Sequence, residues 1–172
     1  MKDILVVVDM QNDFVSGSLG TDEAKKIVGP LVDLVENFQG DIYFTRDSHG
    51  PDYLKTQEGK NLPVEHCIKN TPGWEIIDQL KGYVGENVVD KVTFGSRDLI
   101  EILEGVNKDQ GIKSITLAGL CTDICVISNA LALKAFLPEV PIKVVEGACA
   151  GVSPESHKRA LAAMEVCQIQ II

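Results

Sequence analysis

The feature that most constrains the fold is an alternation of short apolar runs with longer stretches of helical periodicity. Most of the apolar runs lack polar alternation, as in parallel strands that are covered on both faces. The pattern predicts right-handed βαβ units and a three-layer α/β/α sandwich around a mainly parallel, six-stranded sheet. The predicted strands are residues 4–8, 41–45, 86–90, 113–118, 142–146 and 168–172, and the predicted helices are about 27–38, 74–81, 97–105, 122–137 and 154–166.

One segment breaks this rhythm. Residues 46–73 are rich in Gly, Pro, Asp and Asn and show little periodicity. A loop of that length inside a compact domain is usually either functional or disordered. No internal repeat, low-complexity tract or linker divides the chain, and its 172 residues suit one domain with a sizeable core. We therefore expect residues 1–172 to form a single domain.

Composition excludes several classes of partner. The formal net charge is -9, and aromatic residues make up only 5% of the chain. Nucleic acid and anionic membranes both bind clustered Lys and Arg, so a small-molecule substrate is the better expectation. The apolar run at residues 4–8 is too short for a signal-peptide core or a membrane span, which favours a cytoplasmic protein.

The cysteines point to free thiols. Five cysteines at irregular spacing do not form a disulfide framework, and disulfides are rare in the cytosol. Cys121 and Cys125 form C-x-x-x-C, but no second pair with ligand spacing accompanies them, which disfavours a zinc or redox site there. Each thiol is therefore either small buried packing or chemistry.

Reactive side chains follow several of the predicted strands. In an open parallel sheet, ligands bind outside the carboxyl ends of the strands, near the point where strand order reverses. Asp9 follows the first strand, Lys91 follows the third, and Cys125 lies in the first turn of a helix. Alone, each has an ordinary interpretation as a turn residue, a surface lysine or a packed cysteine. Together they predict a thiol whose thiolate is favoured by a cation and a helix N-terminus, beside a carboxylate that moves its proton.

The irregular loop carries a second set of polar side chains. Asp47 and His49 are two residues apart, and Glu58 and His66 follow in the same segment. Imidazole and carboxylate groups suit zinc, manganese or iron. The alternative is a polar surface loop whose histidines are incidental, and spacing alone does not separate the two interpretations.

These stretches resemble a known family. The chain is similar to the isochorismatase-like cysteine hydrolases, and within them to the nicotinamidases, over nearly its whole length. The motifs occur in the order that the family has. They are residues 5–14 (LVVVDMQNDF), 45–49 (TRDSH), 62–67 (LPVEHC), 91–96 (KVTFGS) and 118–126 (AGLCTDICV).

The resemblance implies an isochorismatase-like hydrolase fold and a catalytic Asp, Lys and Cys, which correspond to Asp9, Lys91 and Cys125. It also implies a non-proline cis peptide bond between Leu120 and Cys121. In the family this bond aims backbone N–H groups, here those of Cys121 and Cys125, at the oxyanion of the reaction.

The resemblance further implies a divalent metal, with zinc expected and manganese or iron as alternatives. An Asp-x-His pair and a later His hold it in nicotinamidases, matching Asp47, His49 and His66. Glu58 falls where some members have a fourth ligand. The metal's role there is to bind the pyridine nitrogen of the substrate.

The expected activity is hydrolysis of nicotinamide to nicotinate and ammonia in NAD salvage. We expect Phe14, Leu62 and Thr122 to line the substrate pocket, with Leu62 standing where many members have Trp or Phe. One alternative is another small amide or ureido substrate on the same triad, and isochorismate hydrolysis is a weaker one. A third, of a different class, is a non-catalytic binding domain. Many relatives form homo-oligomers, so self-association is also an expectation.

Overall fold

The computed structural model describes residues 1–172, and its strands form one six-stranded sheet. The spatial order of the strands is β3-β2-β1-β4-β5-β6, and every neighbouring pair is parallel. The predicted parallel α/β sheet is therefore confirmed, and strand order reverses between β1 and β4. The strands are β1 (Lys2–Val8), β2 (Asp41–Asp47), β3 (Val88–Lys91), β4 (Ile112–Leu120), β5 (Ile142–Ala150) and β6 (Gln170–Ile171).

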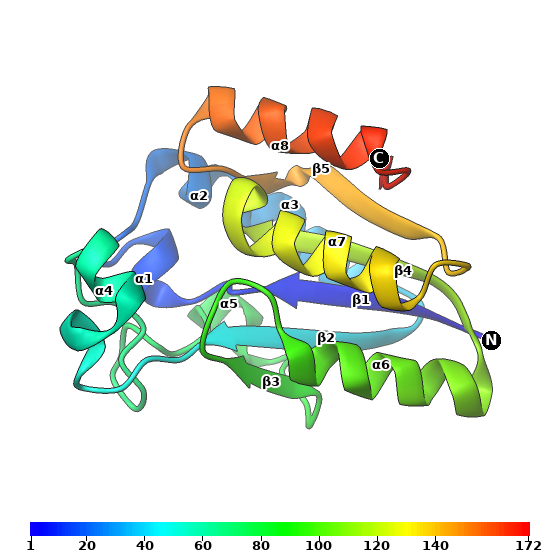
Figure 1. Ribbon diagram of the computed structural model, residues 1–172, viewed down its shortest axis with the longest axis horizontal. Helices are drawn as coiled ribbons and strands as arrows, with labels where there is room; N and C mark the ends of the chain where they lie inside the picture. The colour runs from blue at the N-terminus through cyan, green and yellow to red at the C-terminus, as the bar shows by residue number, and fades with distance from the viewer.

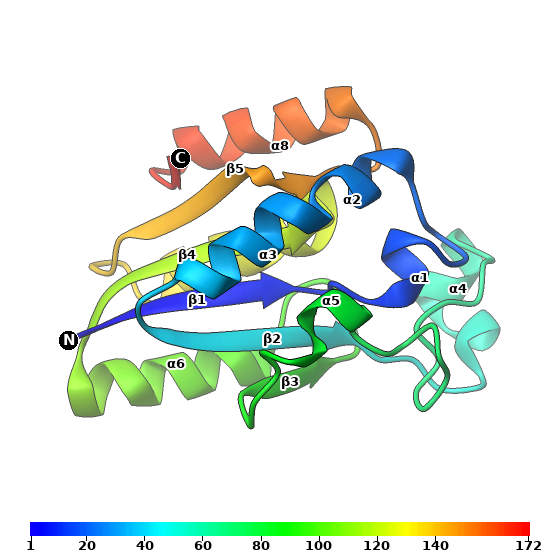
Figure 2. The same cartoon turned by 180° about the vertical axis from the view of Figure 1, so that it is seen from behind.

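Helices cover both faces of the sheet. α6 (Arg97–Gln110) and α7 (Ile127–Phe136) lie across one face (Figure 1). α3 (Val28–Asn37) and α5 (Asp78–Lys81) lie across the opposite face, which Figure 2 brings to the front. α8 (Pro154–Val166) packs beside α7 along β5 and β6. Right-handed crossovers require this division when strand order runs outward in both directions from the centre of the sheet.

The central strand β1 shows why the sheet is so deeply buried. Residues 4–8 are all apolar and fully buried, so both faces of the strand contact apolar side chains. They belong to one cluster of 39 buried hydrophobic residues that also includes side chains of both helix layers. Removing apolar surface from water contributes about 25 cal/mol per Å², so this cluster is the main source of stability.

Two helix starts follow the local sequence. The side chain of Ser96 accepts the N–H of Leu99 at the start of α6. Ser153 forms a capping box with Ser156 at the start of α8, whose first residue is Pro154. Serine caps satisfy N–H groups that the first helical turn leaves free, and proline at that position loses no hydrogen bond.

The helix predicted at residues 74–81 is shorter than expected. Only its last turn, α5, is helical, because the residues before it are extended against the segment after β1. Gln11 and Ile76 form an isolated antiparallel bridge there, and the N–H of Asn12 donates to the carbonyl of Glu75. Tertiary pairing thus overrides the helical periodicity of this stretch.

The helix predicted at residues 122–137 begins with a different geometry. Its first turn, η2 (Thr122–Val126), is a π-helix, in which the N–H of Ile127 reaches the carbonyl of Thr122. The α-helix α7 starts only after this turn. Single π-helical turns occur frequently at functional sites.

Short elements gather at the carboxyl end of the sheet. Figures 1 and 2 show the first and fourth helices of the chain beyond the arrowheads of β1 and β2, and the irregular segment after β2 contributes two of the short elements. The short elements are α1 (Asn12–Val15), α2 (Asp22–Lys26), η1 (Tyr53–Lys55) and α4 (Gln57–Asn61).

No helix in the structure combines the length and apolar character needed to span a membrane.

Candidate active site

Strand ends and a helix start bring a carboxylate, an ammonium and a thiol together. Asp9 follows β1 directly, Lys91 is the last residue of β3, and Cys125 lies in the π-helical turn after β4. Lys91 Nζ is 2.6 Å from Asp9 Oδ2 and 3.4 Å from Cys125 Sγ. All three side chains are buried, with residue exposures of 0%, 4% and 5% for Asp9, Lys91 and Cys125. The structure thus brings the three residues singled out in the sequence into one crevice.

The backbone around Asp9 is held in an unusual conformation. Its φ is +49°, a region that costs a non-glycine residue about 1–3 kcal/mol. The Asp9 N–H is held by both the carbonyl and the hydroxyl oxygen of Thr45, each at 3.2 Å. On the other neighbouring strand, Gly119 has φ +124°, and an added Cβ there would overlap the carbonyl oxygen of Val8. Close strand contacts therefore fix where the Asp9 carboxylate lies.

Burial dominates the electrostatics of these groups. It raises the pKa of Asp9, although the Lys91 ammonium opposes the rise. Burial and the Asp9 charge raise the pKa of the Cys125 thiol well above its usual value, with Lys91 acting in the opposite direction. Burial would lower the pKa of Lys91, but Asp9 and Cys125 outweigh it and raise that pKa. Burial and Asp9 therefore outweigh the thiolate-favouring effect that the sequence predicted for Lys91 and the helix N-terminus.

Backbone donors lie beside the thiol. The Leu120–Cys121 peptide bond is cis, and the N–H of Cys121 donates to no backbone carbonyl. Cys121 and Cys125 line the same cavity. The side-chain amide of Asn129 donates to the carbonyls of Cys125 and Phe94, at 2.8 and 3.1 Å. It therefore ties the turn that carries Cys125 to the loop after β3.

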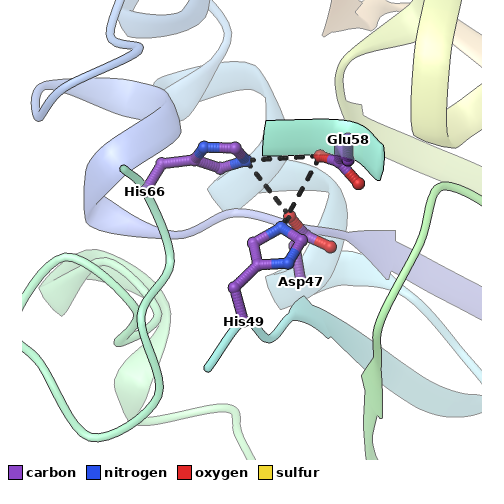
Figure 3. Close-up of side chains that lie close together, drawn as sticks. All are labelled: Asp47, His49, Glu58 and His66. Carbon is purple, nitrogen blue, oxygen red and sulfur yellow. Dashed lines mark hydrogen bonds and ion pairs between the residues drawn. The ribbon is translucent and has the colours of Figure 1, made fainter. Parts of the chain in front are cut away.

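We call Asp9, Lys91 and Cys125 the triad. Four side chains beside the triad point toward one common position, as the ligands of a metal ion do (Figure 3). They are Asp47, His49, Glu58 and His66, whose ligand atoms all lie within 4.8 Å of one another. His66 Nδ1 bonds the carbonyl of Val64 at 2.8 Å, and because a carbonyl only accepts, Nδ1 carries the proton. The Nε2 lone pair is then left to face Asp47 and Glu58. This donor set and its spacing fit a divalent metal.

Asp47 connects the metal-type cluster to the triad. Its Oδ2 is 2.7 Å from His49 Nε2, and its Oδ1 is 3.3 Å from Lys91 Nζ. Burial opposes ionisation of Asp47, but the neighbouring side chains of His49, His66 and Lys91 together hold its pKa well below the usual range. Burial and the charge of Asp47 instead raise the pKa of Glu58. Lys91 is therefore a cation shared by both groups.

The side chain of Gln11, which sequence reasoning did not single out, holds the backbone of Asp47. The Gln11 amide donates to the Asp47 carbonyl at 2.8 Å and accepts its N–H at 2.7 Å. Gln11 also donates to the carbonyl of Trp74, whose ring N–H donates to Ser48 Oγ. The guanidinium of Arg46 stacks 3.8 Å above the Trp74 ring. Gln11 lies inside the 5–14 motif, so the sequence did hold a signal for it.

A cavity of about 240 Å³ opens onto both groups. Its lining includes the Cys125 thiol together with the cluster residues Asp47, Glu58 and His66. Most of the remaining wall is apolar, and no Lys or Arg belongs to it. Sequence reasoning missed five lining residues, Leu19, Thr21, Phe94, Ile124 and Val152.

Two of the three residues predicted to line the substrate pocket do line the cavity. Phe14 and Leu62 line the cavity, and the Phe14 ring lies 5.5 Å from the His66 ring, centre to centre. Thr122 does not line it: the residue is fully buried and its hydroxyl hydrogen-bonds His157 Nδ1 at 2.8 Å. The expectation for Thr122 is corrected accordingly, because the π-helical turn directs its side chain toward α8 instead.

The chain is similar in sequence and in structure to known proteins. A sequence model of the isochorismatase domain matches residues 3–172. A nicotinamidase from Schizosaccharomyces pombe is 30% identical over 207 aligned positions, which cover 98% of this chain and 91% of the relative. The crystal structure of a pyrazinamidase of Pyrococcus horikoshii in complex with zinc is 29% identical, with a TM-score of 0.82 and coverage of 100% and 99%. An N-carbamoylsarcosine amidase from Thermoplasma acidophilum is 30% identical, with a TM-score of 0.76 and coverage of 99% and 95%.

Proposed function

This chain belongs to the isochorismatase family, and on that premise we propose that it hydrolyses nicotinamide to nicotinate and ammonia. The observation that carries the proposal is one small cavity lined by both the Cys125 thiol and the metal-type ligands Asp47, Glu58 and His66. Nicotinamide presents an amide carbon and a ring nitrogen on one rigid ring, so it can contact both groups at once. Similarity to a nicotinamidase and a pyrazinamidase supports this substrate.

In the proposed reaction, Cys125 is the nucleophile and Asp9 is the general base. The raised pKa of the thiol means that its proton must be removed as the sulfur attacks. Asp9 accepts that proton, and the carbon–sulfur bond forms at the amide carbonyl. Lys91 stabilises the negative charge that the transfer creates around sulfur and carboxylate, because its ammonium contacts both. The carbonyl electron pair moves onto oxygen.

The backbone N–H groups of Cys121 and Cys125 stabilise this oxyanion in the proposal. When the tetrahedral species collapses, the carbon–nitrogen bond breaks and Asp9 returns its proton to the departing nitrogen, which leaves as ammonia. Water then attacks the thioester while Asp9 takes one of its protons. The carbon–sulfur bond breaks, the thiol recovers a proton, and nicotinate leaves.

Recognition of the ring belongs to the metal-type cluster. We propose that Asp47, His49 and His66 hold zinc, with Glu58 as a further ligand. When bound, such a cation supplies a Lewis-acid contact for the pyridine nitrogen. Phe14 and Leu62 enclose the flat faces of the ring, and the apolar wall excludes water from the thioester.

A second candidate substrate class is an N-carbamoyl amino acid, favoured by the similarity to an N-carbamoylsarcosine amidase. Such substrates carry a carboxylate. No Lys or Arg lines the cavity, whereas Asp47 and Glu58 do. The carboxylate of such a substrate would therefore face two acidic side chains without a protein counter-ion. Isochorismate, a dicarboxylate, meets the same obstacle. The cavity therefore favours a neutral aromatic amide.

We also assign the reaction to NAD salvage and to the cytosol. All five cysteines are free thiols, which suits a reducing compartment.

Ammonia release from nicotinamide and from N-carbamoylsarcosine tests the proposal. We expect the parent protein to prefer nicotinamide and Cys125→Ala to lower kcat at least about 10⁴-fold, as loss of a nucleophile does in other hydrolases. Cys149→Ala is the matched control, because that buried thiol lies outside the cavity. Near-parent turnover by Cys125→Ala would refute the nucleophile, and a preference for N-carbamoylsarcosine would refute the substrate.

A further inference from the structure

The two carboxylate oxygens of Asp9 have different surroundings. Oδ1 accepts a hydrogen bond of 2.6 Å from the hydroxyl of Thr45. Oδ2 faces the Lys91 ammonium at 2.6 Å and accepts no hydrogen bond from any other group. Lys91 also contacts Cys125 Sγ, so the ammonium that faces Oδ2 is the same ammonium that contacts the thiol. The carboxylate is therefore held in one of two otherwise equivalent orientations.

The Thr45 hydroxyl can donate in only one direction. Its oxygen accepts the N–H of Asp9 at 3.2 Å, which leaves the hydroxyl hydrogen to point at Oδ1. Thr45 and Asp9 are both 0% exposed, so water does not compete for these groups. The β-branched side chain has few rotamers, and β-sheet pairing of Val8 with Thr45 fixes its position next to Asp9. One hydroxyl thus binds both the main chain and the side chain of Asp9.

We infer that Thr45 is a positioning residue that fixes Asp9 so that Oδ2, and not Oδ1, receives the proton of Cys125. The inference rests on the proposed function, because it assigns a role within the same thiol reaction. Thr45 touches neither the substrate nor the sulfur and acts through Asp9 alone. Without the hydroxyl, the Asp9 carboxylate loses the partner that sets its rotamer. The Asp9 N–H also loses one of the two acceptors that hold the backbone at its positive φ.

Three substitutions separate the hydroxyl from the shape of the side chain. Thr45→Val keeps the β-branched shape and loses the hydroxyl. Thr45→Ser and Thr45→Ala both lose the methyl group and differ from each other only in the hydroxyl. We expect Val and Ala to lower kcat for nicotinamide about 10- to 100-fold with little change in KM, and Ser to stay within a few-fold of the parent.

A second readout does not depend on the substrate. The rate at which iodoacetamide alkylates Cys125, measured against pH in a Cys167→Ala background that removes the exposed thiol, reports proton transfer from sulfur. Asp9 is faced by Lys91, Asp47, Cys125 and Thr45. Burial and Asp47 raise the pKa of Asp9, whereas Lys91 and the Thr45 hydrogen bond lower it. Loss of that bond raises the pKa of Asp9 further, so the acid limb of the profile should move to higher pH in Val and Ala, and not in Ser.

The outcomes are distinct. Loss of kcat and a displaced acid limb in Val and Ala, with rescue by Ser, supports the inference. Equal losses in Ser and Ala, or parent-like profiles in Val and Ala at an unchanged melting temperature, overturn it. If Val does not fold, the Ser and Ala pair decides alone. If the parent protein does not hydrolyse nicotinamide, the proposed function fails, and the alkylation profiles still test Thr45.

Discussion

The triad and the metal-type cluster are adjacent but built from different kinds of structure. The triad sits on the ends of β1 and β3 and on the turn after β4, and Asp9 is completely buried. The cluster has only Asp47 on a strand, and the other ligands lie on the irregular segment after β2. The Glu58 side chain remains 18% exposed. In the proposed function, the thiol chemistry therefore depends on the sheet and the recognition of the ring depends on a loop.

This difference explains how one fold can act on several different amide substrates. A loop can change its ligands and its wall residues while the sheet keeps the thiol, carboxylate and ammonium in place. Changes to the triad should therefore act on kcat, and changes to the cluster on KM. Lys91 is the point where the two regions meet, because its ammonium contacts both Asp9 and Asp47.

The largest expected effect comes from breaking that shared contact. Lys91→Met leaves the buried Asp9 carboxylate without a cation, which should cost about 3–5 kcal/mol of unfolding free energy. We also expect kcat to fall about 10³-fold or more, since the charge formed on proton transfer loses its counter-ion. Urea unfolding and ammonia release measure the two effects.

The control is Lys113→Met, whose ion pair with Asp3 lies on the surface and should contribute no more than about 1 kcal/mol. If Lys91→Met were as stable as Lys113→Met, the shared cation would not have the structural role described.

The next effect concerns the backbone beneath the triad. Gly119→Ala should lower the unfolding free energy by about 2–4 kcal/mol, because φ is positive there and the new methyl group meets the Val8 carbonyl. Gly105→Ala in α6 is the opposite case, because no atom lies within 4 Å of its added Cβ. That variant should gain up to about 1 kcal/mol from helix propensity. Equal stabilities of the two variants in urea would contradict the claim that strand contact positions Asp9.

The cluster should respond through KM. His66→Ala removes a ligand and one side of the cavity, so we expect KM for nicotinamide to rise about 10- to 100-fold while kcat changes less. His157→Ala is a matched control, since this imidazole bonds Thr122 and does not line the cavity. Steady-state kinetics and metal analysis of both variants provide the measurement. A large fall in kcat at constant KM would mean that the cluster takes part in the thiol chemistry.

The smallest expected effect is a gain. Leu62→Phe places an aromatic ring on the cavity wall, and aromatic pairing contributes about 0.5–1.5 kcal/mol. We therefore expect KM for nicotinamide to fall about 2- to 10-fold, with kcat unchanged. Leu54→Phe, another exposed leucine but outside the cavity, should leave KM as it is. A rise in KM for Leu62→Phe would show that the leucine is fitted to a different substrate.

The sequence predicted the triad's location because one rule governs it. Parallel strands end at one edge of the sheet, so reactive residues that follow β1, β3 and β4 had to meet there. Asp9, Lys91 and Cys125 are consequently in contact, as the position of each in the chain suggested. The same rule brought Asp47 to that edge.

The remaining parts depend on packing that no local pattern encodes. The π-helical turn redirects Thr122 away from the cavity, and a helical pattern gives no sign of such a turn. Leu19 and Val152 reach the cavity from segments far apart in the chain, and apolar loop residues of this kind carry no periodic signal. The raised pKa of Cys125 follows first from burial, which composition and spacing do not reveal.

The central claim is that nicotinamide hydrolysis passes through a thioester on Cys125. Hydroxylamine added during turnover intercepts such a thioester, because it competes with water for the acyl carbon after ammonia has left. We predict that nicotinohydroxamate forms at the expense of nicotinate as hydroxylamine increases, and that Cys125→Ala forms neither product. Nicotinate as the sole product at an undiminished rate of ammonia release, or hydroxamate from Cys125→Ala, would contradict the claim.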